Sequence, residues 1–380
     1  MKKVSSLSSF NNRVFLGKNK ILSITLFVIS LVFLCTSASY TKRGSQNTIN
    51  DVSVKTGEIK DLVLIYNGGA HRAVIWNEEK FEPYVSVPDA EGENENWLFD
   101  GFLFLEIHDG THSFASGYRP TPARKQEWIG LIEGYLTEGN GIKALDACIG
   151  KAKKRCKDTF RKRKIVISLP EPIPNQKDWG ELNGKNMDFS EDRDRIVACE
   201  WYIDYIIRRF NEEKLQNVEL CGFYWLAEEA TNTRTFVSKV ADYIHQKEYS
   251  FYWIPYFNSD GYSEWKNLGF DQAFLQPNHF FNDNIPDSRI DDACVLAKKM
   301  GMSVEMEFDE NAVEGKGRAN RLRAYIDGFK KNNIFENTDI AYYQGDHALY
   351  MLRHGSEADR RLYRELAGLI ADRQKRSNVK

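Results

Sequence analysis

The chain has 380 residues, of which 42% are apolar and 13% aromatic, and its formal net charge at pH 7 is −2. This apolar content is enough for one large globular domain and excludes a chain that is disordered over most of its length. The basic side chains before residue 40 leave a remainder with a charge of about −7, so we expect no nucleic-acid partner.

The first 39 residues have the order of a secretory signal. Basic side chains precede the apolar run 21–34, and the small-residue stretch CTSASY follows it. The run is short for a transmembrane helix, so cleavage after about Ala38 or Ser39 is the preferred interpretation, with an uncleaved anchor as the alternative. Residues 40–59 are interpreted as a polar linker. We therefore expect a secreted, periplasmic or cell-surface protein that would touch a membrane only through an uncleaved N-terminal anchor.

Runs of aliphatic and aromatic residues recur from residue 60 to residue 376, and amphipathic segments separate most of them. Eight runs are predicted to be strands: KDLVLIYNGG (60–69), WLFDGFLFLEIHDG (97–110), RKIVISLPEP (163–172), NVELCGFYWLAEE (217–229), YSFYWIPYFN (249–258), FDQAFLQPNHFF (270–281), MSVEMEFDE (302–310) and DIAYYQGDHA (339–348). Helical patterns are clearest at 191–216, 231–247, 287–300, 316–333 and 356–376.

Strands that alternate with helices predict a parallel sheet, and eight such units predict an α/β fold, a closed (β/α)8 TIM barrel over residues 60–376. The first unit departs from this pattern. Between Gly69 and Trp97 there are Pro83, Pro88 and Gly92 and no clear helical pattern, so we expect an irregular excursion in place of the first helix. The cysteines after residue 39 are odd in number and lack a CxxC motif, which favours buried free thiols.

In such a barrel the chemistry lies where strands end and loops begin. Nearly every predicted strand ends in hydrogen-bonding side chains with aromatic residues among them, a combination that suits the hydroxyl edges and apolar faces of carbohydrate. Within this set Asp109 would bind a sugar hydroxyl, and Arg72 would bind the carboxylate of an acidic sugar. The predicted substrate-binding residues are Asn67, Arg72, Asp109, Trp225, Tyr256, Asn258, Gln276, Asn278, Tyr343 and Gln344.

Two predicted strands supply candidate catalytic carboxylates. The stretch SVEMEFDE places Glu305, Glu307 and Asp309 on one face, and the fourth strand ends in Glu228 and Glu229. Glycoside cleavage by two carboxyl groups needs one that is protonated and another that is ionised. The arrangement resembles that of a large superfamily of retaining glycosidases on this barrel, in which the acid/base Glu ends strand four and the nucleophile Glu lies near the end of strand seven. That resemblance assigns Glu228 as acid/base and Glu307 as nucleophile, with Glu229 and Glu305 as the alternatives.

Several motifs together carry a resemblance to a known family. The stretches GFYWLAEE, FYWIPYFN, FDQAFLQPNHFF and GMSVEMEFDE, with LVLIYNGG and WLFDGFLFLE, resemble an uncharacterised bacterial family, domain of unknown function 4855. The resemblance covers roughly residues 60–372 and implies a barrel related to glycoside hydrolases. It implies no substrate.

The expected function is hydrolysis of a poly- or oligosaccharide by a two-carboxylate, retaining mechanism, without a cofactor or a metal. One alternative is a barrel that binds glycans with the same aromatic residues but has lost catalysis, and therefore needs no carboxylate pair. A second alternative is a metal-dependent hydrolase with His279 and Asp346 as ligands. The first strand argues against it, because it lacks the two histidines separated by one residue that such sites use.

Overall fold

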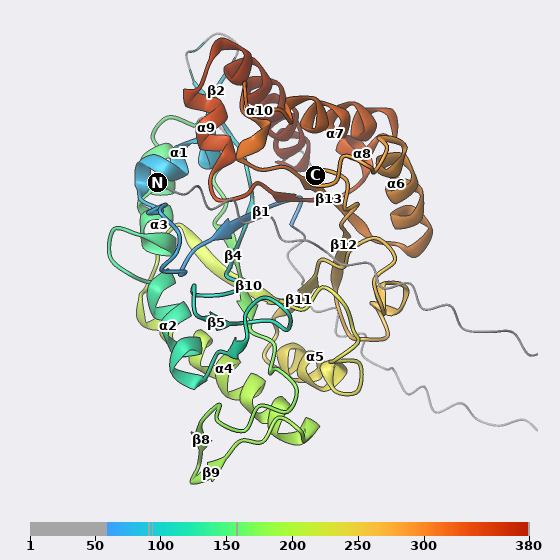
Figure 1. Ribbon diagram of the computed structural model, residues 1–380. Coiled ribbons are helices and arrows are strands. Elements are labelled where there is room, and N and C mark those ends of the chain that lie inside the picture. Colours follow the sequence, from blue (N-terminus) through green and yellow to red (C-terminus); the bar gives the residue numbers. More distant parts are fainter. Residues whose placement is uncertain (1–58, 90–91, 93, 157–158, 379–380) are drawn as a thin grey trace, which may run out of the picture. The chain divides into compact units, whose positions relative to one another are not determined.

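The computed structural model describes residues 59–89, 92, 94–156 and 159–378 (Figure 1). The predicted signal or anchor at 1–39 and nearly all of the predicted linker at 40–59 lie outside these residues. Within the described part, no helix has the length and apolar character needed to cross a bilayer. The cysteines there are free thiols that are buried or partly buried.

Eight parallel strands close into a barrel, which confirms the predicted fold class (Figure 1). The last strand returns to the first, because Leu62 of β1 pairs with Gly101 on one side and with Ala341 on the other. In chain order the barrel strands are β1 (Asp61–Tyr66), β4 (Gly101–Leu105), β7 (Arg163–Leu169), β10 (Val218–Trp225), β11 (Ser250–Trp253), β12 (Gln272–Leu275), β13 (Ser303–Glu307) and β14 (Ile340–Tyr343).

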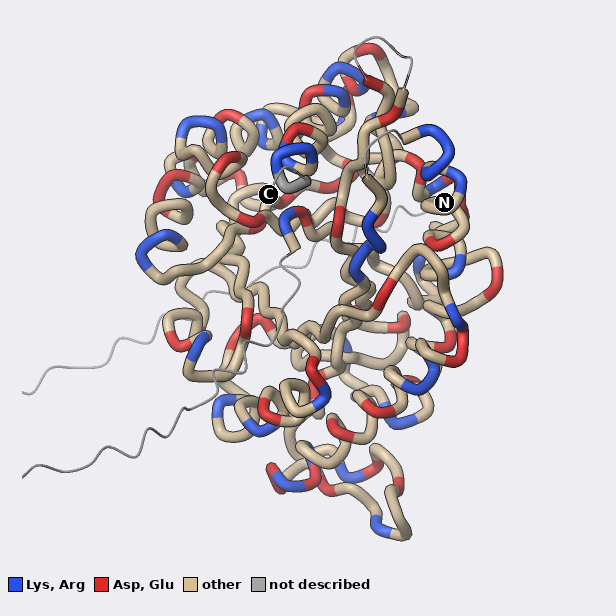
Figure 2. Tube along the Cα trace, turned by 180° about the vertical axis from the view of Figure 1, so that it is seen from behind, with Lys and Arg blue, Asp and Glu red and all other residues tan. Residues whose placement is uncertain are grey.

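Helices surround the strands, and Lys and Arg are interspersed with Asp and Glu along them (Figures 1 and 2). All five predicted helices are present with shifts of a few residues at their ends. The helices are α1 (Glu78–Val85), α2 (Lys125–Tyr135), α3 (Gly141–Ala152), α4 (Asp192–Glu212), α5 (Val237–Gln246), α6 (Ser288–Met300), α7 (Ala319–Lys331), α8 (Ile334–Asn337), α9 (Ala348–His354) and α10 (Glu357–Asn378).

The first unit is irregular as expected, but it also contains the short helix α1, which the sequence did not predict. The Asn77 side chain caps α1 by accepting a hydrogen bond from the Lys80 amide, and Pro83 lies inside the helix. An antiparallel pair, β2 (Ser86–Pro88) and β3 (Glu95–Trp97), follows α1. It is the fifth unit, between β11 and β12, that has only the 3-10 turn η1 (Tyr262–Glu264).

Loops that follow the barrel strands carry further short elements. β5 (His112–Ser113) pairs with β6 (Thr121–Pro122), and β8 (Glu181–Leu182) forms a hairpin with β9 (Lys185–Asn186). The turn η2 (Glu310–Ala312) follows β13. We call the carboxyl ends of the eight barrel strands, with the loops that leave them, the mouth of the barrel.

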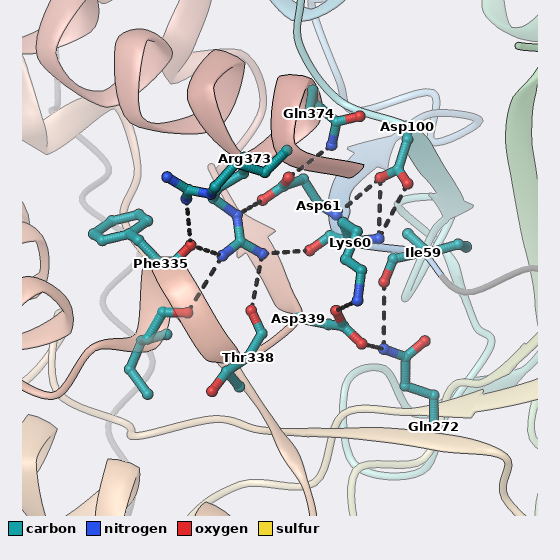
Figure 3. Close-up of polar contacts among 12 residues, drawn as sticks. Ile59, Lys60, Asp61, Asp100, Gln272, Phe335, Thr338, Asp339, Arg373 and Gln374 are labelled. Carbon is teal, nitrogen blue, oxygen red and sulfur yellow. Dashed lines mark hydrogen bonds and ion pairs between the residues drawn. The ribbon is translucent and has the colours of Figure 1, made fainter. Parts of the chain in front are cut away.

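The amino-terminal end of the barrel is held by a buried arginine of α10 (Figure 3). Arg373 donates from Nε to Asp61 Oδ1 at 2.7 Å, and its other nitrogens reach the carbonyls of Lys60, Phe335 and Thr338. Gln374 donates to the second oxygen of Asp61 at 2.7 Å. The guanidinium therefore ties α10 to the start of β1 and to the segment that leads into β14.

Replacement of Arg373 by Ala should lower the free energy of unfolding by about 3–5 kcal/mol, because it leaves the Asp61 carboxylate buried without its cation. Denaturant unfolding of the variant and the parent measures this difference. Lys375→Ala, which removes an exposed cation from the same helix, is the matched control and should change stability by less than about 0.5 kcal/mol. Equal stability of the two variants would show that the buried pair does not hold the barrel closed.

Candidate active site

Three carboxyl groups come together at the mouth. Glu305 and Glu307 lie two residues apart in β13 and therefore share the face of the strand that looks into the barrel. Glu228 follows the end of β10, which is separated from β13 by β12 and β11 in the barrel. The negative charges of Glu307 and Glu228 both act on the pKa of Glu305, which places all three groups within electrostatic reach of one another.

Glu307 is held by donors from two neighbouring elements. The Tyr325 hydroxyl of α7 donates to Oε2 at 2.5 Å, and the His279 amide donates to the same oxygen at 3.2 Å. Gln276 approaches the other oxygen, Oε1, from Nε2 at 3.2 Å. Burial raises the pKa of Glu307, and these hydrogen bonds oppose that shift because they stabilise the anion. Glu307 is thus fixed in orientation, and Oε1 is the less occupied oxygen.

Glu228 has the environment of a group that carries a proton near neutral pH. Burial, together with the negative charges of Glu307 and Glu229, raises its pKa from 4.5 to about 7. No side-chain hydrogen bond opposes the shift, and the side chain keeps some contact with solvent. A carboxyl group with this pKa can donate a proton in one step and accept one in the next.

Glu305 lies one layer deeper and is 2% exposed. Burial is the main cause that raises its pKa well above 4.5, and the charges of Glu307 and Glu228 add to the shift. Among the described residues its carboxyl group accepts no hydrogen bond. A proton shared by the cluster is therefore held more readily by Glu305 and Glu228, whereas the donors around Glu307 favour its ionised form.

Aromatic rings surround the carboxyl groups. Tyr66 and Tyr343 meet edge to face with centroids 5.6 Å apart, and Phe281 meets Tyr343 in the same way at 5.5 Å. Phe281 is 45% exposed and Tyr118 is 43% exposed. The charge of Glu228 is the largest cause that raises the pKa of Tyr118, so this exposed ring belongs to the same region.

Several predicted substrate-binding residues lie beside the carboxyl groups. Gln276 contacts Glu307, and Tyr343 belongs to the aromatic set. The Tyr256 hydroxyl donates to Glu229 Oε2 at 2.7 Å, which turns Glu229 toward the loop after β11. Asn278 is an exposed turn residue whose side chain accepts a hydrogen bond from Gln276.

Three of the predicted residues are corrected by their positions. Trp225 is 1% exposed and packs against Phe236, so it belongs to the core outside the strands. Gln344 is fully buried and accepts a hydrogen bond from Tyr84 of α1. Asn67 is buried against Gly141 at the start of α3. Each of them follows an inward-facing residue directly, and alternation therefore turns it toward the helices.

Two further predictions concern charged residues that the structure shows to be engaged. Asp109 accepts hydrogen bonds from the Thr111 and His112 amides and from the His112 ring, so it organises its own loop. Arg72 lies at the mouth over the Tyr66 ring, but carboxylates of the protein occupy its guanidinium. Asn258 is exposed in a left-handed turn after β11, and no carboxyl contact of its side chain is present in the described part of the chain.

The sequence did not single out Tyr66, Tyr118, Phe281 or Tyr325. Tyr118 and Phe281 lie in loops without periodicity, and Tyr325 fits the apolar stripe of α7, which predicts core. Only Tyr66, as the last residue of β1, had a position that the strand-end rule could have found. Over the residues that the structure covers, no three His, Cys, Asp or Glu side chains are grouped as a metal site would need.

Comparison with known proteins identifies a family and several distant barrels. The family model described as Domain of unknown function (DUF4855) matches residues 61–368. No curated protein matches the chain. Among solved structures, a candidate alpha-L-fucosidase from Bacteroides thetaiotaomicron VPI-5482 is similar at 12% identity and a TM-score of 0.42, over 87% of this chain and 100% of that one.

Two other solved structures are similar at the same level. A GH18 chitinase from Pseudoalteromonas aurantia has 12% identity and a TM-score of 0.42, over 81% of this chain and 99% of that one. A tryptophan synthase complex from Pyrococcus furiosus has 9% identity and a TM-score of 0.36, over 82% of this chain and 100% of that one. These three proteins have different activities, so their similarity to this chain indicates no particular reaction.

The raised pKa of Glu228 should make stability depend on pH. The folded state holds this proton more tightly than the unfolded chain, so the contribution to stability is complete below about pH 4.5 and is lost as the pH rises through about 7. Glu228→Gln cannot lose that proton, and at pH 8 it should be more stable relative to the parent than at pH 5 by about 2 kcal/mol. Chemical denaturation at both pH values measures the difference. The control is Glu219→Gln, which changes an exposed residue at the other end of β10. If the free energy of unfolding depended on pH in the same way in the parent and in Glu228→Gln, the raised pKa of Glu228 would be contradicted.

Proposed function

The chain belongs to the family described as Domain of unknown function (DUF4855), and from its own site we propose that it hydrolyses glycosidic bonds of a poly- or oligosaccharide. Glu228 is the acid/base and Glu307 the nucleophile of a retaining mechanism. The observation that carries the proposal is the contrast between two neighbouring carboxyl groups. Glu228 has a pKa of about 7 and receives no hydrogen bond from the described residues, whereas Glu307 is fixed by Tyr325, His279 and Gln276.

The first chemical step uses the proton of Glu228. As the glycosidic bond breaks, Glu228 donates this proton to the leaving oxygen, and Glu307 Oε1 forms a bond to the anomeric carbon. The hydrogen bonds from Tyr325 and His279 occupy Oε2, and Oε1, which accepts the 3.2 Å hydrogen bond from Gln276, is the oxygen that attacks. In the second step the Glu228 carboxylate takes a proton from water, and that water displaces Glu307 from the anomeric carbon. Two displacements on one carbon retain its configuration.

The aromatic residues supply a binding surface for the same substrate. Tyr118 and Phe281 expose large parts of their rings, and Tyr343 contacts both Phe281 and Tyr66. An aromatic ring stacks on the apolar face of a sugar, and the adjacent hydroxyl and amide groups bind its hydroxyls. These exposed rings also support the second candidate function, a barrel that binds glycans without cleaving them.

We also propose that the protein acts outside the cytoplasm, as a secreted, periplasmic or cell-surface enzyme. The support is the order of basic, apolar and small residues in the first 39 positions. Cell fractionation with N-terminal sequencing of the product tests this: a mature end near residue 40 supports cleavage, and a membrane fraction with the intact N-terminus supports an anchor.

Glu228→Gln and Glu307→Gln should each lower turnover of a cleaved glycan at least about a hundredfold while the fold is retained. Glu219→Gln removes an exposed carboxylate from β10, the strand that precedes Glu228, and should leave turnover unchanged. The substrate is found by release of reducing ends from a panel of plant, host and microbial glycans. Turnover that survives both site substitutions would refute the pair, and tight binding without any cleavage would favour the binding protein.

The stereochemistry of the first product tests the retaining step separately. Proton NMR of the fresh reaction mixture should show the anomer of the substrate before mutarotation. An inverted first product would assign Glu307 as the base that activates water and would exclude a glycosyl-enzyme intermediate at Glu307.

A further inference from the structure

We propose that the mouth accepts uncharged glycosides and rejects sugars that carry carboxylate or sulfate groups, because the arginine best placed to bind an anion is neutralised within the protein. This inference concerns the substrate class of the proposed hydrolase and rests on that proposed function. It reverses the expectation from sequence that Arg72 binds the carboxylate of an acidic sugar.

Arg72 lies against one of the aromatic rings at the mouth. Its guanidinium carbon lies 4.5 Å from the centroid of the Tyr66 ring. Tyr66 in turn contacts Tyr343, so a sugar stacked on these rings would lie beside the guanidinium. From position alone, Arg72 would recognise an anionic substituent.

The contacts of Arg72 remove that possibility. Its Nε and Nη2 donate to the two oxygens of Glu106 in a bidentate pair, with Nη2 to Oε1 at 2.7 Å, and its Nη1 donates to Asp346. Glu106 is fully buried and also accepts the Ile107 amide. Two carboxylates thus surround one guanidinium, and the group of three carries a net negative charge.

Other arginines in the loops of the mouth are engaged in the same way. Arg234 pairs with Asp260 at 2.6 Å and with Glu264, and Arg318 pairs with Asp283 at 3.3 Å while it donates to the Phe280 carbonyl. Arg119 is different. It directly follows Tyr118 and is exposed, and within the described part of the chain its guanidinium lies 3.4 Å from the His108 ring and beside no carboxylate, so it is the residue through which an anion could still bind.

The carboxyl groups of the mouth have neutral partners. Tyrosine hydroxyl and amide groups donate to Glu307 and Glu229, and the pKa values of Glu228 and Glu305 are raised by burial and by the like charges of neighbouring carboxyl groups. An anionic sugar bound beside these groups would lie in a negative field, and Arg72, the cation that contacts Tyr66, is already paired with two carboxylates. A neutral sugar needs only stacking and hydrogen bonds, both of which the site provides.

The test measures binding of paired ligands to the full-length Glu307→Gln protein by calorimetry. Each neutral glycan of the panel, for example dextran oligosaccharides or methyl-esterified oligogalacturonides, is compared with its carboxymethylated, sulfated or free-acid counterpart. The neutral member of at least one pair should bind at least about tenfold more tightly than its anionic counterpart at low salt. Asp346→Asn, added to this protein, should free one edge of Arg72 and raise the affinity for the anionic member about fivefold.

Matched variants make the outcome specific. Asp242→Asn removes an exposed carboxylate from α5 and should leave the ratio of neutral to anionic affinity unchanged. Arg119→Ala should also leave this ratio unchanged. If Asp346→Asn fails to fold, Asp346→Ser serves for the same measurement. Three outcomes would overturn the inference: anionic glycans that bind as tightly as their neutral partners, weaker binding of anionic glycans after Arg119→Ala, or a protein that binds neither class.

The result is separable from that of the proposed function. If the protein bound neutral glycans selectively and the parent hydrolysed none of them, the inferred selectivity would be supported and the proposed hydrolase contradicted. If the protein hydrolysed acidic glycans and this activity depended on Glu228, the hydrolase would be supported and the inferred selectivity overturned.

Discussion

The barrel depends on one buried contact at its amino-terminal end. Arg373 of the last helix reaches Asp61 at the start of the first strand, and the same guanidinium binds the Thr338 carbonyl just before the last strand (Figure 3). A closed sheet requires the first and last strands to meet, and these are the strands farthest apart in the sequence. The entropy of closing so long a loop opposes this pairing, and the bonds of Arg373 offset it where the two strands begin. The positions of Tyr66 and Tyr343 at the mouth follow from that closure.

Buried carboxyl groups at the two ends of the barrel differ in their partners. At the amino-terminal end burial raises the pKa of Asp61, and a guanidinium, an amide and a tyrosine hydroxyl oppose that shift by binding the carboxylate. At the mouth Glu228 and Glu305 have burial and like charges around them, and their pKa values rise accordingly. Such an arrangement opposes folding, so a well-paired opposite end is needed to support it. Buried carboxyl groups that lack partners are typical of sites where proton transfer takes place.

The sequence predicted the strands and the order of the carboxylates because both depend on short-range patterns. Alternation in SVEMEFDE is enough to place Glu305 and Glu307 on one face. The same alternation holds at the ends of strands: Tyr224 and Tyr343 face inward, so their neighbours Trp225 and Gln344 face the helices, and the prediction that these two bind substrate was wrong.

Other features could not be read from local pattern. Helix α1 is held by its Asn77 cap and by packing of Phe81, and Gly130 and Gly134 weaken the helical pattern of α2. Tyr325 donates to Glu307 from α7, and the apolar pattern of that helix predicts only that Tyr325 is buried in the core. The pairing of Arg72 with Glu106 and Asp346 joins three separate loops. These contacts depend on tertiary structure, and no spacing in the chain encodes them.

Acid catalysis and selection of substrate would then have a common origin. Burial is the main cause that raises the pKa of Glu228 to about 7, and the charges of Glu307 and Glu229 add to that shift. A free cation beside these carboxyl groups would weaken the effect of those charges. If Arg72 were free to bind an anionic sugar, its positive charge at the mouth would favour the ionised form of Glu228 and lower its pKa. Neutralisation of Arg72 by Glu106 and Asp346 prevents this. The like charges that add to the effect of burial on the pKa of Glu228 are therefore the same charges that would repel an acidic substrate.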